Sequence, residues 1–407
     1  MEQDKQDAKY MARAIQLARK GLYTTDPNPR VGCVLVKDGR IIGEGWHKRA
    51  GLAHAEVEAL TDAANATENT NGATAYVTLE PCSHHGRTPP CCETLVKAGI
   101  KRVVAAMQDP NPRVSGNGFA YLKAVGIEVS CGVLEEDALV LNRGFIMRMT
   151  EGRPFVRSKL AMSLDGRTAM ASGESQWITS PEARADVHKL RAESSAILTG
   201  INTVLADDPS LTARIDKEVV QPIRVVLDSS LKMPLPSKML DLPGRTIILT
   251  CGQQADLSND MIPFMVRRPE EVPVVQAHHE RNHIKTVRPE LVEGHKDKPQ
   301  QLQNAGAEVY QLPEKQGQLD LAEVMKFLAE QEINEVLVEA GAVLNGALLA
   351  ENLVDEWVIY MAPKILGDQG RGLFTLPELD KLSDSKEMKF KGIRQIGNDL
   401  KLTILKR

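Results

Sequence analysis

Three residues in the N-terminal third are of the types that bind a catalytic metal ion. His54 lies two positions before a glutamate, Glu56, and two cysteines, Cys82 and Cys91, follow further along the chain. One imidazole and two thiolates form a normal set of zinc ligands and leave the fourth tetrahedral position to water. Bound zinc lowers the pKa of that water, so that hydroxide becomes available at neutral pH. The pattern therefore predicts a zinc site with His54, Cys82 and Cys91 as ligands.

Glu56 has the position that a proton-transfer group needs beside such a site. It lies near an expected helix start, where it can reach the water without being a ligand. Taking a proton from water and giving it to a departing amine is what hydrolytic deamination requires. A His-x-Glu segment followed by Pro-Cys-x-x-Cys is the signature of zinc nucleobase deaminases. Here eight residues separate Cys82 from Cys91, so the spacing differs from that signature.

These residues also permit two other interpretations. A closed structural zinc site would need a fourth protein ligand, and Cys92 is the obvious candidate, although its position next to Cys91 makes tetrahedral geometry awkward. The cysteines could also be core residues near an unrelated histidine. We expect Cys33, Cys131 and Cys251 to be small buried residues. The motif alone leaves both alternatives open.

The elements that must position these residues alternate between helical and strand patterns. Helices are predicted at 8–20, 54–66, 91–98 and 119–124, and strands at 31–36, 41–46, 73–79, 102–107 and 127–131. Lys37-Asp38-Gly39-Arg40 predicts a hairpin turn between the first two strands. We expect one α/β layer domain that ends near Arg143.

A second alternation of patterns begins at Phe155. Strands are predicted at 155–162, 196–199, 223–227, 246–250, 335–339 and 355–362, and helices at 181–193, 319–331 and 343–351. The chain of 407 residues also exceeds the roughly 250–300 residues at which a single core stops growing. We therefore expect two α/β domains, at residues 1–145 and 146–407.

Residues 267–300 fit neither alternation. They are polar and mixed in charge, they contain proline, and they interrupt a short connection between residues 250 and 306. A structureless segment of this length is uncommon inside a compact domain. Its histidines, His278, His279, His283 and His295, could suggest a metal site. The composition favours an exposed, solvated insertion instead, and we assign it no function.

The composition argues against several classes of protein. The net charge is −4, and residues 1–145 hold 17 basic and 17 acidic residues, so no basic excess favours nucleic acid. The N-terminus lacks the apolar run of a signal peptide, and no apolar stretch approaches the roughly 18 residues that a membrane span needs. We expect a cytoplasmic protein that acts on small molecules, with neither nucleic acid nor membrane as a partner.

With these pieces together, the chain resembles a known family, the bifunctional riboflavin-biosynthesis deaminase–reductases. The most specific segments are 27–32 (PNPRVG), 51–56 (GLAHAE) and 78–91 (TLEPCSHHGRTPPC). The long loop between the cysteines looks like a family trait, so the unusual spacing becomes support. The resemblance covers nearly the whole chain apart from 267–300. It implies a cytidine-deaminase-like α/β/α domain followed by a dihydrofolate-reductase-like α/β domain.

The resemblance also implies the first activity. The N-terminal domain would remove the 2-amino group of 2,5-diamino-6-(5-phosphoribosylamino)pyrimidin-4-one. Positions matching the family's pocket are Asn28, His47, His84, Arg87, Asp109 and Asn111. Asn28 can orient the amino-pyrimidine edge, and His84 and Arg87 can meet the sugar phosphate. Asn28, Asp109 and Asn111, each next to a proline, could also be turn residues only.

The second implied activity is the NADPH-dependent reduction of the ribosyl chain of 5-amino-6-(5-phosphoribosylamino)uracil to ribityl. The C-terminal half has no Gly-x-Gly-x-x-Gly motif, so the usual dinucleotide site is not indicated. The resemblance is carried by segments 158–166 (SKLAMSLDG), 199–203 (TGINT), 207–214 (DDPSLTAR) and 339–342 (EAGA).

These segments imply residues that bind the cofactor and the substrate. Cofactor positions are Ala161, Trp177, Thr203, Asp207 and Ser229, with Gly341, Ala342, Val343, Leu344, Asn345, Gly346 and Ala347 at the diphosphate. Substrate positions are Ser175, Arg191, Leu211, Arg214 and Glu339, with the two arginines on the phosphate. Lys159 could polarise the sugar C1′–nitrogen system and Asp207 could orient it. Trp177 could also be a packing residue, and Asp207 part of a turn.

Three competing hypotheses remain. A polynucleotide deaminase is disfavoured because the basic excess is missing. A zinc-stabilised scaffold would need four protein ligands. A working deaminase could also be joined to a reductase that the 267–300 insertion has inactivated, although the insertion falls between predicted elements. The resemblance further suggests a homo-oligomer of unspecified size.

Overall fold

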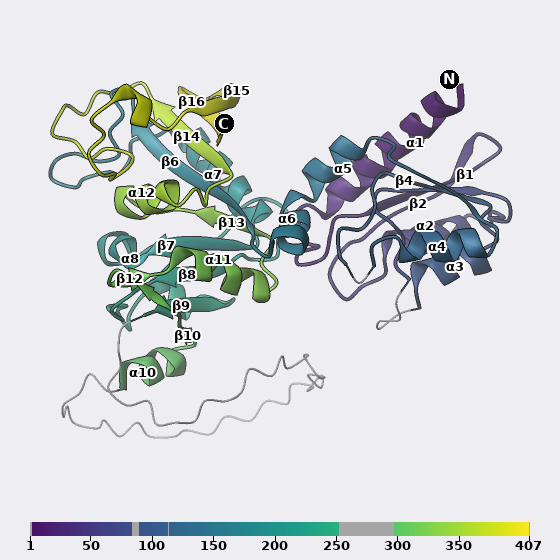
Figure 1. The fold of residues 1–407 in the computed structure, drawn as a ribbon, viewed down its shortest axis with the longest axis horizontal. Helices are drawn as coiled ribbons and strands as arrows, with labels where there is room; N and C mark the ends of the chain where they lie inside the picture. Colours follow the sequence, from purple (N-terminus) through teal and green to yellow (C-terminus); the bar gives the residue numbers. More distant parts are fainter. Residues whose placement is uncertain (1, 84–88, 113, 252–296, 407) are drawn as a thin grey trace.

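The chain builds two separate sheets (Figure 1). The computed structural model describes residues 2–83, 89–112, 114–251 and 297–406. One sheet has five strands in the order β2-β1-β3-β4-β5, and the other has nine in the order β10-β9-β8-β7-β13-β6-β14-β16-β15. Each predicted alternation of helix and strand thus produces its own sheet.

The N-terminal sheet combines an antiparallel hairpin with parallel strands. Its strands are β1 (Gly32–Lys37), β2 (Arg40–Trp46), β3 (Thr74–Val77), β4 (Arg102–Ala105) and β5 (Glu128–Cys131). β1 pairs antiparallel with β2 and β3, whereas β3, β4 and β5 run parallel. The predicted hairpin turn is confirmed, since Asp38 and Gly39 both have positive φ, 50° and 75°, as a type I′ turn requires.

Helices cover both faces of this sheet. They are α1 (Glu2–Ala18), α2 (Ala55–Asn65), α3 (Cys91–Lys97) and α4 (Asn117–Ala124). Alternate residues of β1 face opposite cores: Cys33 and Leu35 pack with α2, α3 and α4, while Val34 and Val36 pack with α1. The predicted α/β/α arrangement is therefore confirmed.

Two helices absent from the sequence prediction connect the sheets. They are α5 (Glu135–Leu141) and α6 (Arg143–Glu151), and they lie between the two halves in Figure 1. The boundary placed between residues 145 and 146 falls inside α6. The chain then enters β6 (Phe155–Ser163), in the middle of the second sheet.

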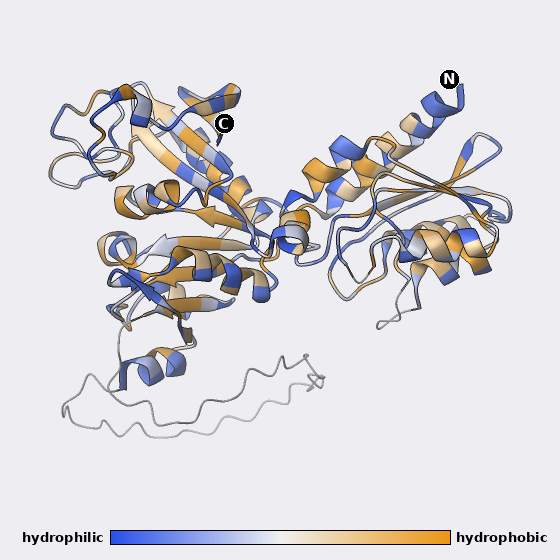
Figure 2. Ribbon diagram, viewed as in Figure 1, coloured by the Kyte–Doolittle hydropathy of each residue, from blue (hydrophilic) through white to orange (hydrophobic). Residues whose placement is uncertain are grey.

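The C-terminal sheet is mostly parallel and is covered on both faces. Its other long strands are β7 (Ala196–Gly200), β8 (Ile223–Leu227), β9 (Thr246–Thr250), β10 (Glu308–Gln311), β13 (Glu335–Val338), β14 (Glu356–Ala362), β15 (Met388–Ile396) and β16 (Asp399–Lys406). A small separate hairpin is formed by β11 (Glu314–Lys315) and β12 (Gln318–Leu319). Apolar residues, orange in Figure 2, make up most of the central strands, as expected for parallel strands covered on both faces.

The helices of this half form a layer on each side of the sheet. They are α7 (Pro181–Glu193), α8 (Ile201–Asp207), α9 (Lys238–Asp241), α10 (Lys298–Asn304), α11 (Leu321–Glu330) and α12 (Ala342–Ala350). One core packs α11 and α12 against the sheet, and the other packs α7, α8, α9 and α10. Within the described ranges, no helix is both long and apolar enough to cross a lipid bilayer.

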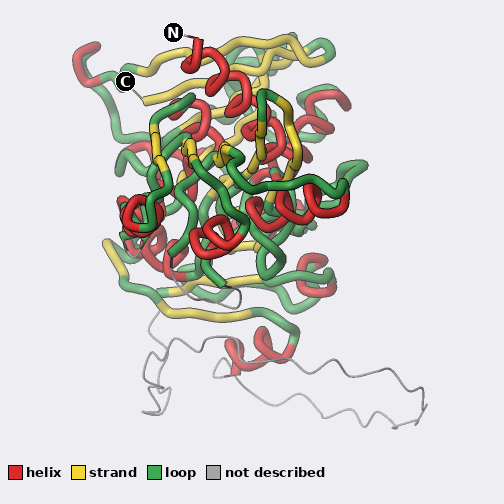
Figure 3. The backbone as a smooth tube through the Cα atoms, turned by 90° about the vertical axis from the view of Figure 1, so that its right-hand side faces the viewer, coloured by secondary structure: helices red, strands yellow, loops and turns green. Residues whose placement is uncertain are grey.

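Several sequence predictions need correction. The hairpin of β15 and β16, which forms one edge of the nine-stranded sheet opposite β10 (Figures 1 and 3), was not predicted. The last residues of the predicted 267–300 insertion belong to α10, while residues 267–296 and their four histidines lie outside the described residues. Cys33 and Cys251 are buried as expected, but Cys131 is exposed, because β5 is an edge strand.

A buried carboxylate joins α1 to the N-terminal sheet. Asp7 accepts hydrogen bonds from Tyr76 of β3 at 2.8 Å and from both terminal nitrogens of Arg102 of β4 at 2.9 and 2.7 Å. Hydrogen bonding from the Arg102 guanidinium favours the ionised carboxylate and lowers the pKa of Asp7 from 3.8 to about 2. The ion pair therefore stabilises the folded chain only while Asp7 is ionised.

We expect Asp7→Asn to lower the free energy of unfolding by about 2 kcal/mol at neutral pH. Because the folded state depresses this pKa, the stabilisation is present above the unfolded value and is lost as the pH falls through about 2. Urea unfolding over a pH series should therefore show the variant and the parent converging in acid. Asp216→Asn, which changes an exposed carboxylate, is the control. A loss that does not depend on pH would contradict the electrostatic explanation.

Candidate active sites

The three predicted metal ligands come together in the structure. The donor atoms of His54, Cys82 and Cys91 all lie within 4.8 Å of one another. His54 Nδ1 is 3.2 Å from Cys91 Sγ and 3.6 Å from Cys82 Sγ. The thiol of Cys92 instead donates to the carbonyl of Pro81 at 3.2 Å. In the part of the chain that the structure describes, the cluster thus offers three protein ligands.

Two helix starts place two of these ligands. His54 is the N-cap of α2, and Cys91 is the first residue of α3. α2 lies very close to β2 because β2 has glycines at the contact. A Cβ on Gly45 would lie 2.3 Å from the backbone nitrogen of Ala59, and one on Gly43 would lie 2.3 Å from its carbonyl oxygen. Larger residues at these positions would push α2, and His54 with it, away from the sheet.

The electrostatics of the cluster favour a thiolate. The Cys91 thiol donates to the Cys82 sulfur, which lowers the pKa of Cys82 to about 4 and raises the pKa of Cys91. The backbone N–H of Cys91 also donates to Cys82 Sγ at 3.3 Å. Hydrogen bonding to Cys82 raises the pKa of His54. A thiolate and an imidazole beside it are the donor types that zinc prefers.

Glu56 lies next to the cluster without belonging to it. It is in the first turn of α2 and is only 4% exposed. Burial raises the pKa of its carboxyl group, and the negative charge of Cys82 acts in the same direction. A carboxyl group with a raised pKa can accept a proton and hold it between two steps of a reaction.

Asn28 and His47 form a connected pair at the same site. Nδ1 of His47 is 2.9 Å from the carbonyl of Ala53, which can only accept, so this nitrogen carries the proton. Nε2 then accepts from the Asn28 side-chain amide at 3.0 Å. The His47 ring meets the His54 ring edge to face, with centroids 5.4 Å apart. Burial lowers the pKa of His47, which favours this neutral form.

A residue that the sequence prediction missed shapes the loop of Asp109 and Asn111. The buried carboxylate of Glu80 accepts backbone hydrogen bonds from Asp109, Gly116, Gly118 and Phe119, at 2.9–3.2 Å. Asp109 in turn accepts from the Asn111 backbone at 2.8 Å. Glu80 directly precedes Pro81 and Cys82 in the sequence. A buried acid beside the metal motif was the available signal. His84 and Arg87 lie outside the described residues.

Several of the C-terminal candidate residues lie in or just after the parallel strands of the second sheet. The strands β6, β7, β8 and β13 run parallel, so their carboxyl ends share one edge of the sheet. Ala161 lies in β6, and α8 with Thr203 follows β7. Ser229 lies just after β8, and Glu339 directly follows β13. This edge is where ligands bind in parallel α/β sheets.

α12 opens at this edge with an accessible backbone. Gly341 is its N-cap and is exposed, and a Cβ there would meet nothing within 4 Å. Val343 is also exposed, whereas Asn345 and Gly346 are buried. The Asn345 side chain accepts from Ser158 at 2.6 Å and donates to the Gly341 carbonyl at 3.1 Å. Within the predicted segment 341–347, the Asn345 side chain therefore holds the turn, while Gly341 and Val343 are exposed to solvent.

A partly buried ion pair lies near Lys159. Arg191 of α7 donates to both carboxylate oxygens of Glu339, at 2.6 and 2.8 Å. Burial lowers the pKa of Lys159, while the negative charge of Glu339 opposes that shift. The carboxylate thus lies between two cations, and Lys159 is less basic than a surface lysine.

Arg214 extends this cationic region toward solvent. Its guanidinium donates to the Thr212 hydroxyl at 2.8 Å, and Arg191 donates to the Thr212 carbonyl at 3.2 Å. Nε2 of His188, a residue that the sequence analysis did not assign to the site, lies 3.1 Å from a terminal guanidinium nitrogen of Arg214. Leu211 is buried with a φ of +46°. The two arginines predicted for one phosphate thus share a neighbour.

The remaining candidates lie in different surroundings. Trp177 is 62% exposed, Arg184 stacks on its ring at 4.5 Å, and its carbonyl accepts from Lys364 at 2.7 Å. It does not pack in the core. Ser175 lies in the loop just before it, and Asp207 is exposed at the end of α8. Ser229 donates to Gln318 at 3.2 Å.

Comparisons with known proteins match both halves. The model of the RibD C-terminal domain matches residues 154–402, and that of the cytidine and deoxycytidylate deaminase zinc-binding region matches residues 4–107. The riboflavin biosynthesis protein RibD of Escherichia coli K12 is 48% identical over 98% of this chain and 99% of its own length. RibD from Haemophilus influenzae is 46% identical over 99% and 98%.

Two solved structures share the whole architecture. One form of Acinetobacter baumannii RibD has a TM-score of 0.83 at 40% identity, with both chains fully covered. A Thermotoga maritima protein has a TM-score of 0.79 at 34% identity, again with both chains covered in full. The Thermotoga maritima protein is described as a diaminohydroxyphosphoribosylaminopyrimidine deaminase/5-amino-6-(5-phosphoribosylamino)uracil reductase.

Glu80→Gln should lower the free energy of unfolding by about 3 kcal/mol. An amide can accept through its oxygen only, so two of the four backbone N–H groups would face an NH2 group and lose their acceptor. Urea unfolding measures the loss, and Glu136→Gln at an exposed position is the control. An unchanged stability would show that the carboxylate does not hold this loop.

Proposed function

This chain belongs to the RibD family of bifunctional deaminases and reductases of riboflavin biosynthesis, and we propose its substrates, cofactors and site residues on that basis. The first step is hydrolysis of the 2-amino group of 2,5-diamino-6-(5-phosphoribosylamino)pyrimidin-4-one. The second is reduction of the ribosyl chain of 5-amino-6-(5-phosphoribosylamino)uracil with NADPH. The proposed division into residues 1–145 and 146–407 assigns one step to each part, and a cytoplasmic homo-oligomer is the expected setting.

One observation carries the deaminase assignment. One imidazole nitrogen and two cysteine sulfurs lie within 4.8 Å of one another, and the buried Glu56 is next to them. This donor set fits Zn²⁺ with an open fourth position, as a hydrolytic site needs and a closed structural site lacks. The match to a deaminase zinc-binding region supports the same metal.

The protein's own groups perform the proton transfers. Zinc held by His54, Cys82 and Cys91 would supply hydroxide at neutral pH by lowering the pKa of water. Glu56 accepts the proton of the water and delivers it to the departing amine. Its burial favours the protonated form between these two events. Because Glu56 is in the first turn of α2 and His54 is its N-cap, the helix sets the position of Glu56 relative to this proposed ligand.

The substrate is oriented by the Asn28–His47 pair. His47 accepts from the Asn28 amide nitrogen, which fixes the direction of the amide. The Asn28 oxygen can then accept from an amino group of the pyrimidine. Asp109 and Asn111, on the loop held by Glu80, complete the proposed pocket, and His84 and Arg87 are proposed for the phosphate.

The reductase site is proposed at the carboxyl edge of the second sheet. NADPH supplies the hydride, and the exposed N-terminus of α12 fits its diphosphate. The other proposed cofactor contacts are Ala161, Trp177, Thr203, Asp207 and Ser229. Arg191 and Arg214 fit the substrate phosphate, with Ser175, Leu211 and Glu339 nearby in the proposed site. Lys159 is proposed to polarise the sugar C1′–nitrogen system, with Asp207 orienting it.

Glu56→Gln should retain zinc and lower the deamination rate at least about 100-fold, because the amide cannot carry the proton. Ammonia release and NADPH oxidation would be followed together with the diamino-pyrimidinone ribosyl phosphate, and zinc content would be measured separately. The parent should show both signals and the variant neither.

Adding the deaminated intermediate to Glu56→Gln should restore NADPH oxidation. Glu58→Gln, on the same helix but paired with Lys48 at the surface, is the matched control and should behave as the parent. Near-normal ammonia release by Glu56→Gln would exclude its proton-transfer role. Ammonia without NADPH oxidation in the parent would show that the C-terminal half does not perform the second step.

Arg214→Ala should raise the KM of the reduction about tenfold and leave deamination unchanged. A charge-assisted hydrogen bond to phosphate contributes about 1.5–3 kcal/mol, and the loss weakens substrate binding. Steady-state kinetics of each step with its own substrate measure the effect. Lys326→Ala removes an exposed cation on α11 and controls for net charge. If both activities fell equally, the two steps would not use separate sites.

A further inference from the structure

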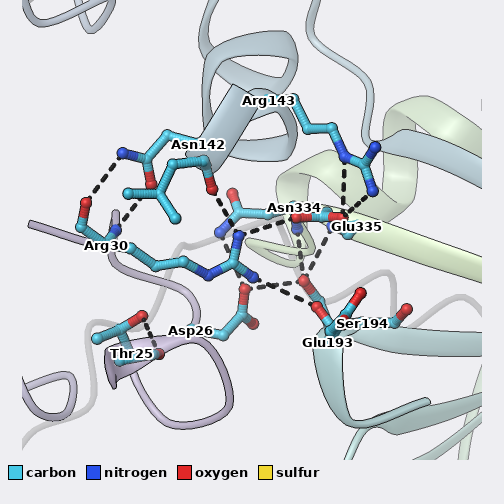
Figure 4. A network of polar contacts seen from close by, with 12 residues as sticks. Thr25, Asp26, Arg30, Asn142, Arg143, Glu193, Ser194, Asn334 and Glu335 are labelled. Carbon is cyan, nitrogen blue, oxygen red and sulfur yellow. Dashed lines mark hydrogen bonds and ion pairs between the residues drawn. The ribbon is translucent and has the colours of Figure 1, made fainter. Parts of the chain in front are cut away.

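The loop that carries Asn28 is attached to the reductase part of the chain (Figure 4). The carboxylate of Asp26 accepts from the Ser195 hydroxyl at 2.8 Å and from the Asn334 side-chain amide at 3.0 Å. The same amide nitrogen donates to the Pro27 carbonyl at 2.8 Å. Two residues of the second sheet thus bind the segment just before Asn28.

The segment just after Asn28 is attached as well. The Arg30 guanidinium donates to Glu335 at 3.1 Å and to the Glu193 carbonyl at 3.3 Å, both in the reductase part (Figure 4). The Arg30 backbone N–H and carbonyl both bond the Asn142 side chain, at 2.8 and 3.0 Å. Asn28 therefore lies between two fixed points, each of which includes groups from outside the deaminase sheet.

The attachment points are buried at the starts of two central strands. Ser195 directly precedes β7, and Asn334 directly precedes β13, its hydrogen-bonded neighbour in the sheet. The Ser195 hydroxyl also accepts from the backbone N–H of Asn334 at 3.1 Å and of Glu335 at 2.9 Å, so its proton points to Asp26. Both residues are buried, at 7% and 5% exposure. Their positions are therefore set by the centre of the reductase sheet.

The contact reaches the substrate residue itself. The Asn28 backbone N–H donates to Thr25 at 2.9 Å, which closes the turn that contains Asp26. A cavity of only about 10 Å³ at this contact is lined by Asn28 together with Asn334 and Glu335, so the three residues lie close together. A change in the angle of Asp26 or Pro27 therefore rotates Asn28 relative to His47.

Stability alone does not explain this arrangement. Burying a carboxylate and a guanidinium between two parts of a chain costs desolvation energy that apolar contacts would avoid. Both Asp26 and Arg30 direct their side chains to polar partners with defined geometry, and both flank the one loop residue assigned to the substrate. Directional contacts of this kind fix an orientation.

We propose that Ser195 and Asn334, which belong to the reductase part of the chain, are positioning residues of the deaminase. They hold the loop of residues 25–30 so that Asn28 meets the amino-pyrimidine in the productive orientation. This inference rests on the proposed role of Asn28 in substrate binding. It makes the deaminase pocket depend on residues more than 160 positions away in the sequence.

Asn334→Asp tests the inference selectively. The Asn334 side-chain oxygen accepts from Arg148 at 2.7 Å, and the new carboxylate preserves this contact. The side-chain nitrogen that donates to the Asp26 carboxylate and the Pro27 carbonyl is replaced by an oxygen, which then faces these two acceptors. In the full-length protein with zinc, we expect the deamination KM to rise about tenfold and kcat to change less. Zinc content and the reductase kcat/KM for the deaminated intermediate should stay within about twofold of the parent.

A double-variant cycle separates positioning from general damage. If Asn334 acts through Asn28, Asn28→Ala combined with Asn334→Asp should deaminate no more slowly than Asn28→Ala alone. Arg153→Met is the matched control, because it removes ion pairs to Glu151 and Asp355 that involve neither the 25–30 loop nor the residues described above as holding it. It should lower thermal stability and leave the deamination KM unchanged.

Three results would overturn the inference. They are an unchanged KM in Asn334→Asp, independent effects of the two substitutions that multiply, or an equal KM increase in Arg153→Met. Failure of the proposed function is distinguishable, since the unmutated protein would then release no ammonia from the pyrimidine substrate.

Discussion

The backbone N–H at the start of α3 donates to the sulfur of Cys82, and the geometry of the N-terminal site depends on this contact. A helix N-terminus carries partial positive charge, which favours a thiolate over a thiol. The contact also fixes where α3 must begin, and Cys91 is its first residue. His54 stands at the start of α2, which packs on the same face of the sheet. Two helix starts and the loop that follows β3 therefore bring the three proposed ligands together.

A second constraint is the network of ion pairs where the two parts of the chain meet, which we call the seam. The Glu335 carboxylate forms ion pairs with Arg30 and Arg143. The Glu356 carboxylate forms ion pairs with Arg143 and Arg157. Each buried carboxylate is shared by two guanidinium groups, and the Lys391 ammonium also pairs with Glu356 at 3.0 Å. Such networks contribute little net stability, because desolvation offsets the attraction, but they permit only one relative placement of the groups. The seam thus sets the orientation in which α6 and the 25–30 loop meet the second sheet.

Local patterns predicted most of the elements, because helix caps and strand alternation are encoded locally. The helix 181–193 was predicted with its observed bounds: Ser180 caps it by accepting from Ala183, and Pro181 fits the first turn. The hairpin of β15 and β16 was missed because its apolar residues do not separate cleanly by face, with Phe390 and Ile393 largely exposed.

The candidate sites likewise contain some residues that the local sequence predicts and others that it does not. The proposed metal ligands were predictable because one histidine and two cysteines in this pattern are typical of a catalytic zinc site. Glu80 was not, because its role lies in four backbone donors that only the folded loop brings to it. The bond between Asn334 and Asp26 joins residues 308 positions apart, and no local pattern encodes such a contact. Sequence reasoning thus predicted the cluster of His54, Cys82 and Cys91, which the structure brings together, and missed the groups that hold the neighbouring loops.

The seam and the reductase site lie at opposite ends of the same two strands. β7 and β13 begin beside Ser195 and Asn334 and end beside Gly200 and Glu339, a span of about 15 Å. Coupling between distant sites requires an element with two discrete arrangements that both sites can bias. These strands are hydrogen-bonded on both sides at the centre of a nine-stranded sheet, and their residues are almost fully buried. Such strands transmit position but offer no second arrangement. The fold therefore favours a fixed alignment of the deaminase loop over a switch that responds to ligands of the reductase.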